Sequence, residues 1–360
     1  MEQFSCGTKI ISGSGAVQQL QALKPKRLLV VADPYFCENG TAERIARLSG
    51  AEESELFGDV SPDPTVALAA KGTAVLNRFL PDTVVALGGG SAIDCAKAMV
   101  FFAGCEAALV AIPTTSGSGS EVTDFAVLTE GGTKHPLVDK RLRPAVAILD
   151  SDLLGSMPPK LVADGGFDVL THALEAFTAK NRGDFSDMLA RESFCAAYAL
   201  LPASFGGQQE VRQRIHNASA MAGLAFTHSG LGLCHALAHS LGGQFHVSHG
   251  RLNAILLPSV IGCNAMKSAD RYALLAQAAG IGGSARAVAV RNLKNALIRL
   301  RRQLQLPATL AEAGIRPAEV WRNADAVVKA TLADPCCETN PVPVEEFMVR
   351  KILEEVTGRV

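Results

Sequence analysis

The sequence predicts an α/β N-terminal domain built on a parallel sheet, followed by an all-α C-terminal domain. Up to about residue 150, short apolar runs alternate with amphipathic stretches, which is typical of parallel strands covered by helices. From Met157 onward the strand patterns stop, and long amphipathic stretches separated by Pro and Gly follow. We therefore place the domain boundary between residues 155 and 156, which gives domains 1–155 and 156–360.

The predicted strands of the first domain are short, apolar and mostly rich in Val, Ile and Leu. They are RLLVVAD (27–33), SELFGDV (54–60), TVVALGGG (83–90), ALVAIPT (108–114) and AVAILD (145–150). Between them, TAERIARLSG and TVALAAKGTAVLNRFL carry apolar residues at helical spacing. The second domain has helical patterns only, and we find no internal repeat or low-complexity segment in the sequence.

Length and composition indicate a protein with a large buried core. The chain has 360 residues, of which 48% are hydrophobic. Its formal charge is −1 and its Lys and Arg residues are scattered, so it lacks the basic patch of a nucleic-acid-binding protein. The apolar runs are broken by Gly, Pro and charged residues, so we expect no membrane span. The expected partner is a small neutral or polar metabolite.

The cysteines point to a reducing compartment. The nine cysteines form no CxxC pair, and the N-terminus MEQFSCGTKII lacks a basic region followed by an apolar run. We therefore expect free thiols and a location in the cytoplasm.

Two glycine-rich or small-residue loops suggest a nucleotide site in the first domain. TVVALGGGSAIDCAKAMVFF leads from a strand through three glycines into a helix, where free backbone N–H groups and the positive helix end can bind a diphosphate. The loop PTTSGSGSE (113–121) follows the next strand, and two such loops favour a ligand at the carboxyl edge of the sheet. The first loop is not a GxGxxG motif, so a tight turn with a structural role stays open as the alternative.

Two charged residues of this domain could contact a dinucleotide. Asp33 ends the first predicted strand, where a carboxylate can bond both ribose hydroxyls and repel a 2′-phosphate, which favours NAD over NADP. The alternative is that Asp33 and Pro34 simply begin a turn. Lys134 could reach a ribose or phosphate oxygen, although an isolated Lys is usually a solvated charge.

Histidines and a carboxylate at helical spacing predict a catalytic metal centre. Asp168 and His172 lie one turn apart in GFDVLTHALEAF, and GLCHALAHSLGGQFHVSHG contains His235, His239 and His249. A single histidine on an apolar helix face is usually a core residue. However, four of the eight histidines fall between residues 235 and 249, in an apolar segment where uncompensated polar groups are costly. Three imidazoles and one carboxylate would bind a divalent transition metal and leave a position for a substrate oxygen.

These motifs resemble those of a known family. GGGSAIDCAKA, AIPTTSGSGSEVT, the Asp168/His172 helix and the histidine block are similar, in order and spacing, to the iron-containing (group III) alcohol dehydrogenases, over essentially the whole chain. Within that family, HNASAMAGLAF, GLGLCHALAHSLGGQFHVSHG and TNPVP look most like the 1-propanol dehydrogenases of propanediol-utilisation microcompartments. The resemblance implies a Rossmann-like domain that binds NAD(H) and a helical domain that holds Fe(II), or alternatively Zn(II).

The resemblance also implies roles for individual residues. The implied metal ligands are Asp168, His172, His235 and His249, with His239 as a neighbour that we expect to relay a proton. The implied cofactor-binding residues are Asp33, Gly89, Gly90, Ser91, Asp94, Thr114, Thr115, Ser118 and Lys134. Phe226 is expected to line the alcohol pocket, and His228 is expected to have only a local packing role.

The implied reaction is the interconversion of a short-chain primary alcohol and its aldehyde, such as 1-propanol and propionaldehyde or ethanol and acetaldehyde. A glycerol or diol dehydrogenase, and a non-redox metal-dependent lyase of the dehydroquinate-synthase type, stay open as alternatives. A non-catalytic scaffold would be expected to have lost ligand positions, and all four are filled here. The family implies a homodimer or higher homo-oligomer. Residence in a bacterial microcompartment, beside an aldehyde dehydrogenase or shell proteins as in the propanol branch, stays open.

Overall fold

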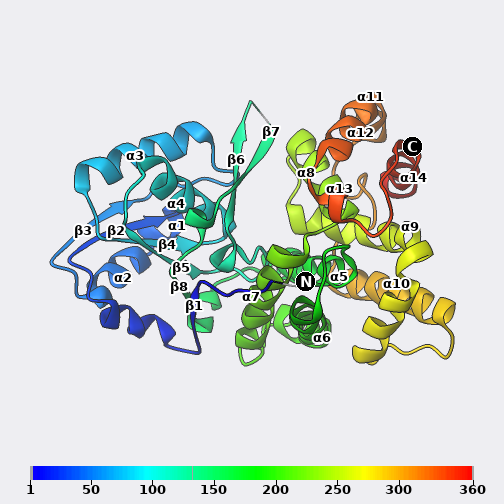
Figure 1. Cartoon of the computed structure of the whole chain (residues 1–360), viewed down its shortest axis with the longest axis horizontal. Coiled ribbons are helices and arrows are strands. Elements are labelled where there is room, and N and C mark those ends of the chain that lie inside the picture. The colour runs from blue at the N-terminus through cyan, green and yellow to red at the C-terminus, as the bar shows by residue number, and fades with distance from the viewer. Residues whose placement is uncertain (1–2, 132, 359–360) are drawn as a thin grey trace. The chain divides into compact units, whose positions relative to one another are not determined.

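The computed structural model describes residues 3–131 and 133–358. They divide into two compact units (Figure 1). The sheet unit comprises residues 5–157 and 212–223, and the helical unit comprises 3–4, 158–211 and 224–358. This division confirms the predicted fold class, with a parallel sheet in the N-terminal part and helices after it. Residues 212–223 lie in the sheet unit although they follow the predicted boundary in the chain.

The sheet unit alternates strands with α-helices and short 3₁₀ helices (η). In chain order its elements are β1 (Lys9–Ser12), η1 (Ala16–Leu23), β2 (Arg27–Ala32), α1 (Pro34–Glu38), α2 (Thr41–Ser49), β3 (Glu53–Phe57), α3 (Val66–Phe79), β4 (Thr83–Gly88), α4 (Gly90–Ala103), β5 (Ala108–Pro113), η2 (Ser120–Val122), β6 (Phe125–Glu130), β7 (Thr133–Val138), η3 (Lys140–Leu142), β8 (Val146–Leu149) and η4 (Ser151–Leu154). Each predicted strand corresponds to one of these strands. The sequence analysis did not identify β1, nor β6 and β7.

The main sheet is parallel, and its strand order reverses next to β4. The order is β1-β8-β5-β4-β2-β3, and every adjacent pair of strands is parallel. From β2 the chain moves outward to β3, and then returns to the other side of β2 as β4. The point between β2 and β4 is thus the topological switch point, where open α/β sheets bind ligands outside the carboxyl ends of their strands. The strands β6 and β7 form a separate antiparallel hairpin.

Alternating side chains of the strands form two hydrophobic cores, one on each face of the sheet. On β4, Val85 and Leu87 pack with buried residues of η1, α1 and α2. The neighbouring Val84 and Ala86 pack on the opposite face with residues of α3 and α4. All four side chains are fully buried, as expected for a strand covered on both faces.

A buried polar network joins α4 to the segment that leads into the hairpin. The ammonium of Lys97 donates to the carbonyl oxygens of Thr123, at 3.0 Å, and Phe125, at 2.7 Å. Burial lowers the pKa of Lys97 to about 8. The neighbouring carboxyl of Glu121 is also buried, and its desolvation raises its pKa to about 7, against a partial lowering by Lys97.

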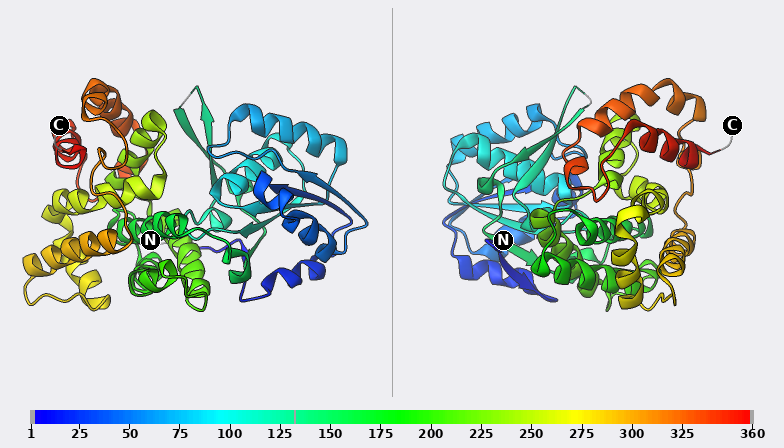
Figure 2. Two further views of the ribbon diagram at one scale, coloured as in Figure 1. Left: turned by 180° about the vertical axis from the view of Figure 1, so that it is seen from behind. Right: turned by 45° about the vertical axis from the view of Figure 1, so that its right-hand side comes forward.

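The helical unit is built around the long helix α9. Its elements are α5 (Pro159–Thr178), α6 (Asp184–Phe205), the end of α7 (Arg212–Ser229), α8 (Leu233–Phe245), α9 (His249–Ala278), α10 (Arg286–Gln303), α11 (Pro317–Arg322), α12 (Ala324–Ala333), α13 (Cys336–Thr339) and α14 (Glu346–Thr357). Helices α5, α8 and α10 pack against α9, and the C-terminal helices α11–α14 gather near α8 at one end of the unit (Figure 2). The interior is apolar enough that any polar side chain within it needs a partner.

Two sequence expectations can be compared with the described residues. None of their helices combines the length and apolar character needed to cross a bilayer. Each of the nine cysteines is free, as expected for reduced thiols.

We predict that Glu121→Gln flattens the pH dependence of stability in the acidic range. The folded-state pKa of Glu121, about 7, lies above its ordinary value of 4.5, so the folded state holds this proton more tightly than the unfolded state. Its contribution to stability is therefore complete below pH 4.5 and is lost as the pH rises to 7. The upper limit of this loss is about 3 kcal/mol.

Urea unfolding of the wild-type protein and the variant between pH 5 and 7.5 measures the effect. The exposed Glu130→Gln serves as the control and should keep the wild-type slope. An equal slope in wild type and Glu121→Gln would show that the carboxyl of Glu121 is already ionised in the folded protein.

Candidate metal centre and nucleotide site

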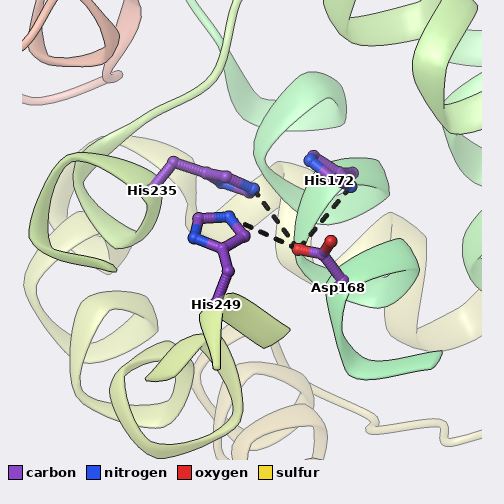
Figure 3. Close-up of side chains that lie close together, drawn as sticks. All are labelled: Asp168, His172, His235 and His249. Atoms are coloured by element: carbon purple, nitrogen blue, oxygen red, sulfur yellow. Dashed lines mark ion pairs between the residues drawn. The ribbon is translucent and has the colours of Figure 1, made fainter. Parts of the chain in front are cut away.

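The helical unit brings together the four side chains predicted to bind a metal (Figure 3). Asp168 and His172 come from consecutive turns of α5, His235 from the first turn of α8, and His249 from the first residue of α9. The Oδ1 atom of Asp168 lies 3.9 Å from His172 Nδ1, 3.9 Å from His235 Nε2 and 3.5 Å from His249 Nε2. One potential ligand atom from each residue lies within 4.8 Å of all the others. This spacing suits a single ion.

The cluster is buried on one side and partly open on the other. Asp168, His172 and His235 are buried, whereas the side chain of His249 is 26% exposed. The rings of His172 and His235 stack with centroids 4.4 Å apart, and Phe226 stacks on His172 at 4.5 Å. Phe226, the predicted pocket residue, therefore lies beside the cluster and gives it an apolar wall.

Glu175 fixes the orientation and tautomer of His235. Its carboxylate lies 2.6 Å from Nδ1 of His235 and accepts hydrogen bonds from the backbone N–H groups of Gly232, Cys234 and His235. Burial, together with the nearby imidazoles His172 and His239, holds the pKa of His235 well below its usual range, so this ring is neutral. Because Nδ1–H donates to Glu175, Nε2 keeps its lone pair and points toward Asp168. A carboxylate that orients a ligating histidine in this way is common at metal sites.

Residues of helix α9 hold the side chain of Asp168 in place. The side-chain amide of Asn253 donates to Oδ1 of Asp168 at 2.8 Å. One turn before Asp168 on α5, Asp164 pairs with Arg251 of α9 at 3.0 Å. Gly250 lies so close to α5 that an added Cβ would collide with the carbonyl oxygen of Asp164. These contacts fix the distance between the helices that carry Asp168 and His249.

His239 lies beside the four-residue cluster but does not belong to it. Its ring stacks on that of His249, with centroids 5.1 Å apart and an interplanar angle of 15°. Its Nδ1 lies 2.8 Å from Oδ2 of Asp334, and its side chain is 30% exposed. The carboxylate of Asp334 thus holds Nδ1 and leaves Nε2 as the nitrogen that can exchange a proton.

Asp33 and the glycines predicted to bind the nucleotide lie in the sheet unit, at the switch point between β2 and β4. Asp33 follows β2, and residues 88–90 end β4 and begin α4. A Cβ added to Gly88 would lie 3.4 Å from the carboxylate of Asp33 and 2.6 Å from Cβ of Ala92. Only glycine fits this turn, since Gly88 also has φ +153°.

The loop after β5 lies directly against these glycines. The N–H of Thr114 donates to the carbonyl of Gly88 at 2.9 Å. A Cβ on Gly89 would lie 3.2 Å from Thr115 Oγ1, and one on Gly90 would lie 3.0 Å from Ser118 Oγ. Helix α4 begins here without a side chain capping its first N–H groups, and Ser91 lies in its first turn. Free N–H groups and hydroxyls at a helix N-terminus are suited to binding phosphate.

Three of the proposed cofactor residues already have partners within the protein. Asp94 accepts hydrogen bonds from the hydroxyl of Ser120 and, at 3.0 Å, from the N–H of Val127. Lys134, on β7, forms a 2.7 Å ion pair with Asp63. Asp33 accepts a 3.3 Å hydrogen bond at the start of α1. The contribution of each to cofactor binding stays a prediction.

The sequence analysis missed several residues that position these sites. Glu175 follows His172 by three residues, so the pattern D-x-x-x-H-x-x-E on one face of α5 is a signal that could have identified it. Asn253 lies four residues after His249 and offers a similar signal. His216 could not be inferred in this way. Its buried Nδ1 lies 3.0 Å from Ser116 Oγ, in the loop after β5, a contact across 100 residues of chain.

Two other residues near the cluster in the sequence, His228 and Cys234, have packing roles. His228 lies 2.9 Å from the carbonyl of Leu224 through Nδ1 and stacks on Phe4 at 4.2 Å. Cys234 is fully buried, and burial raises the pKa of its thiol far above the usual range. It precedes His235 on α8 and is not part of the metal cluster.

A glycine turn at the switch point of a parallel sheet, together with a buried histidine and carboxylate cluster in a helical unit, is the combination expected of a metal-dependent oxidoreductase. The chain matches the family model for iron-containing alcohol dehydrogenase over residues 7–151. It matches the C-terminal model of the Fe-containing alcohol dehydrogenase family over residues 162–357. The chain therefore belongs to the iron-containing alcohol dehydrogenase family, as the sequence motifs predicted.

Individual relatives agree over the full length. The chain is 40% identical to the 1-propanol dehydrogenase PduQ of Citrobacter freundii, over 99% of this chain and 100% of that protein. It resembles the solved iron-containing alcohol dehydrogenase of Thermococcus thioreducens with a TM-score of 0.91 and 32% identity, over 98% of both chains. It also resembles the sulfoacetaldehyde reductase of Bifidobacterium kashiwanohense, solved with NAD⁺, with a TM-score of 0.87 and 27% identity over 98% of both chains.

We predict that Gly250→Ala weakens metal binding as well as stability. The added methyl group has to push α9 away from the backbone of α5, which carries Asp168. Overpacking of this kind costs about 1–3 kcal/mol. Thermal unfolding and metal titration of the purified variant measure the two effects.

Gly262→Ala on the same helix is the matched control. Its added Cβ would have only the ammonium of Lys294 nearby, at 3.8 Å, so this variant should keep wild-type metal affinity. The change to alanine should leave its stability equal or higher, because alanine favours the helix by about 1 kcal/mol over glycine. Equal metal affinity in both variants would contradict a role for Gly250 in setting the distance between the ligands.

Proposed function

We propose that this chain catalyses the NAD(H)-dependent interconversion of a short-chain primary alcohol and its aldehyde. The buried cluster of Asp168, His172, His235 and His249 in the helical unit is the observation that carries this proposal. We propose 1-propanol and propionaldehyde as the first substrate pair, because of the 40% identity to a 1-propanol dehydrogenase, and ethanol and acetaldehyde as the second.

We propose that these four side chains hold Fe(II), with Zn(II) as the alternative ion. Three imidazole nitrogens and one carboxylate oxygen suit either cation. Within the described residues, the buried Nε2 of His235 has no hydrogen-bond partner, which is costly unless an ion takes its lone pair. The Irving–Williams order favours zinc, so iron occupancy depends on geometry and supply. Elemental analysis of protein purified without oxygen distinguishes the two ions.

We propose that the dinucleotide binds at the switch point of the sheet unit. The amides at the start of α4 and the hydroxyls of Thr114, Thr115 and Ser118 would bind the diphosphate. The carboxylate of Asp33 would accept hydrogen bonds from the adenosine ribose and repel a 2′-phosphate, which favours NAD over NADP. Support comes from the closeness of Asp33 to Gly88 and from the resemblance to a reductase solved with NAD⁺.

Within this proposal, a metal held by Asp168, His172, His235 and His249 would supply Lewis acidity, and a nicotinamide cofactor would supply hydride chemistry. The chain itself orients the substrate and moves the proton. Phe226 offers an apolar surface beside His172 for the alkyl group. During alcohol oxidation, Nε2 of His239 accepts the hydroxyl proton and passes it to solvent through its exposed edge. Asp334 stabilises the charged imidazole through Nδ1.

We further propose that the enzyme works as a homo-oligomer in the cytoplasm, inside a bacterial microcompartment. The sequence resemblance to the propanol branch of the family supports this location, where an aldehyde dehydrogenase and shell proteins would be its neighbours. Light scattering measures the oligomeric state. Co-purification with shells isolated from the source cells tests the location, and recovery only in the soluble fraction would contradict it.

We predict that the iron-loaded protein oxidises NADH in the presence of propionaldehyde. The loss of NADH absorbance measures the rate, which should exceed the rate with NADPH because of the charge of Asp33. Asp168→Asn should lower kcat/KM by at least about 100-fold, since replacing even a residue that only orients a ligand costs about 10–100-fold. A chelator should abolish the activity, and Fe(II) should restore it.

The surface variant Asp325→Asn is the matched control and should keep wild-type activity, because this side chain is 90% exposed.

Glu175→Gln tests the orientation of His235 and should lower metal affinity by about 10–100-fold. No change in NADH absorbance over a panel of short aldehydes would rule out the dehydrogenase and favour a metal-dependent lyase.

We predict that His239→Ala lowers kcat by about 10²–10⁴-fold, which is the usual contribution of a general base. Iron content should stay at the wild-type level, because His239 is not in the four-residue cluster. Added imidazole should partly restore turnover, since it can carry the proton in place of the side chain. Full turnover with an unchanged pH profile of kcat would place the proton relay at another residue.

A further inference from the structure

A second group of potential metal ligands lies next to the proposed metal centre. It consists of His239 on α8, Asp334 directly after α12, and Cys336 at the start of α13. One nitrogen, one oxygen and one sulfur atom of these side chains lie within 4.8 Å of one another. We refer to these three residues as the thiol cluster.

Hydrogen bonds hold the thiol cluster close to the geometry of a metal site. Asp334 Oδ2 lies 2.8 Å from His239 Nδ1, and Asp334 Oδ1 accepts from the backbone N–H of Cys336 at 2.9 Å. A tetrahedral zinc site, with bonds of about 2.0–2.3 Å, separates its ligand atoms by roughly 3.3–3.6 Å. The nitrogen and oxygen atoms would therefore have to separate by only about half an ångström to admit an ion.

The local charge also favours a cation. Despite its burial, the pKa of Asp334 lies below its usual range because of hydrogen bonds from His239 and Cys336, so this carboxyl is ionised. Burial and the nearby carboxylates of Asp334 and Glu175 raise the pKa of the Cys336 thiol. The negative potential that disfavours a free thiolate is the same potential that attracts a divalent cation.

We propose that His239, Asp334 and Cys336 form a second, regulatory site for a thiophilic divalent cation such as Zn²⁺ or Cd²⁺. Sulfur, nitrogen and oxygen ligands together select such ions over Mg²⁺ and Ca²⁺. The proposed first site has no sulfur ligand, so the two sites differ in the metals they prefer.

Binding has a defined proton balance and a defined effect. The thiol of Cys336 loses its proton to solvent as the metal–sulfur bond forms. His239 stays neutral, since its proton moves from Nδ1 to Nε2 as Nδ1 binds the ion. An Nε2 that carries this proton cannot accept another from the substrate. The ion would therefore inhibit turnover, and this consequence rests on the proposed role of His239.

The chain provides a matched control for the thiol. Cys337 follows Cys336 directly, but its Sγ donates to the carbonyl of Thr331 at 3.0 Å and is not in the thiol cluster. Replacing either cysteine with serine removes one thiol from the same short helix. Only the loss of Cys336 should affect the second site.

Titration of the iron-loaded enzyme with Cd²⁺ tests the proposal. Formation of a cadmium–thiolate bond gives an ultraviolet charge-transfer band, and the first site cannot produce this band because it lacks a thiol. We expect one equivalent of Cd²⁺ to produce the band in the wild-type protein and in Cys337→Ser, and no band in Cys336→Ser. A band that persists in Cys336→Ser, or its absence from the wild-type protein, would overturn the proposal.

Two further measurements separate this proposal from the proposed function. Asp168→Asn should lose the metal of the four-residue cluster but keep the cadmium–thiolate band. The band therefore tests the second site even if the proposed function is wrong. Inhibition of aldehyde reduction by Zn²⁺ should need about tenfold or more additional metal in Cys336→Ser than in Cys337→Ser. Equal sensitivity of the two variants would refute the inhibitory effect.

Discussion

The hydrogen bond between Glu175 and His235 is the constraint on which the arrangement of the metal centre depends. A carboxylate buried in an apolar helical unit is stable only with several donors, and Glu175 has four within 3.4 Å. Three of them are N–H groups at the beginning of α8, where a helix favours negative charge. The same carboxylate therefore attaches the start of α8 to α5 and determines which nitrogen of His235 is free to bind an ion.

The two sites follow different physical rules. The metal centre is built from side chains on helices, and two of them, His235 and Asp168, are held from behind by Glu175 and Asn253. The nucleotide site is built from backbone and small side chains, and the close approach of its two loops is possible because residues 88–90 lack side chains. At the metal centre the protein has to give each buried polar group a hydrogen-bond partner. At the proposed nucleotide site it has to leave space for the ligand next to the backbone.

This difference explains how much could be predicted from the sequence. The spacing of Asp168 and His172 identifies a helical face, and glycines after an apolar strand identify a turn, so local patterns were sufficient to locate both groups of candidate residues. The partners Glu175 and Asn253 were accessible from helical spacing but appeared to be ordinary polar residues. Asp334 lies 95 residues from His239, and no local pattern connects the two.

Missed elements of the fold have similar causes. The strand β1 has four residues and is largely exposed, so its apolar alternation is weak. The hairpin of β6 and β7 carries Thr, Lys and His, which do not resemble a buried parallel strand. Residues 212–223 have a helical pattern and belong to the sheet unit because of tertiary contacts. His216 and Gly223 pack against the loop after β5, and Gln213 donates to the carbonyl of Leu149.

The number of contacts made by each residue also bears on how related sequences can diverge. Asp33 serves the fold as the cap of α1, where its carboxylate accepts from the N–H of Phe36, so its replacement costs the fold only about 1 kcal/mol. Glu175 cannot be lost alone, because the N–H groups of α8 and the ring of His235 would all lose their acceptor in the apolar interior. Because we propose that Asp33 selects between the two nicotinamide cofactors, that preference would change in one step over evolutionary time, whereas the pair at positions 175 and 235 has to change together or not at all.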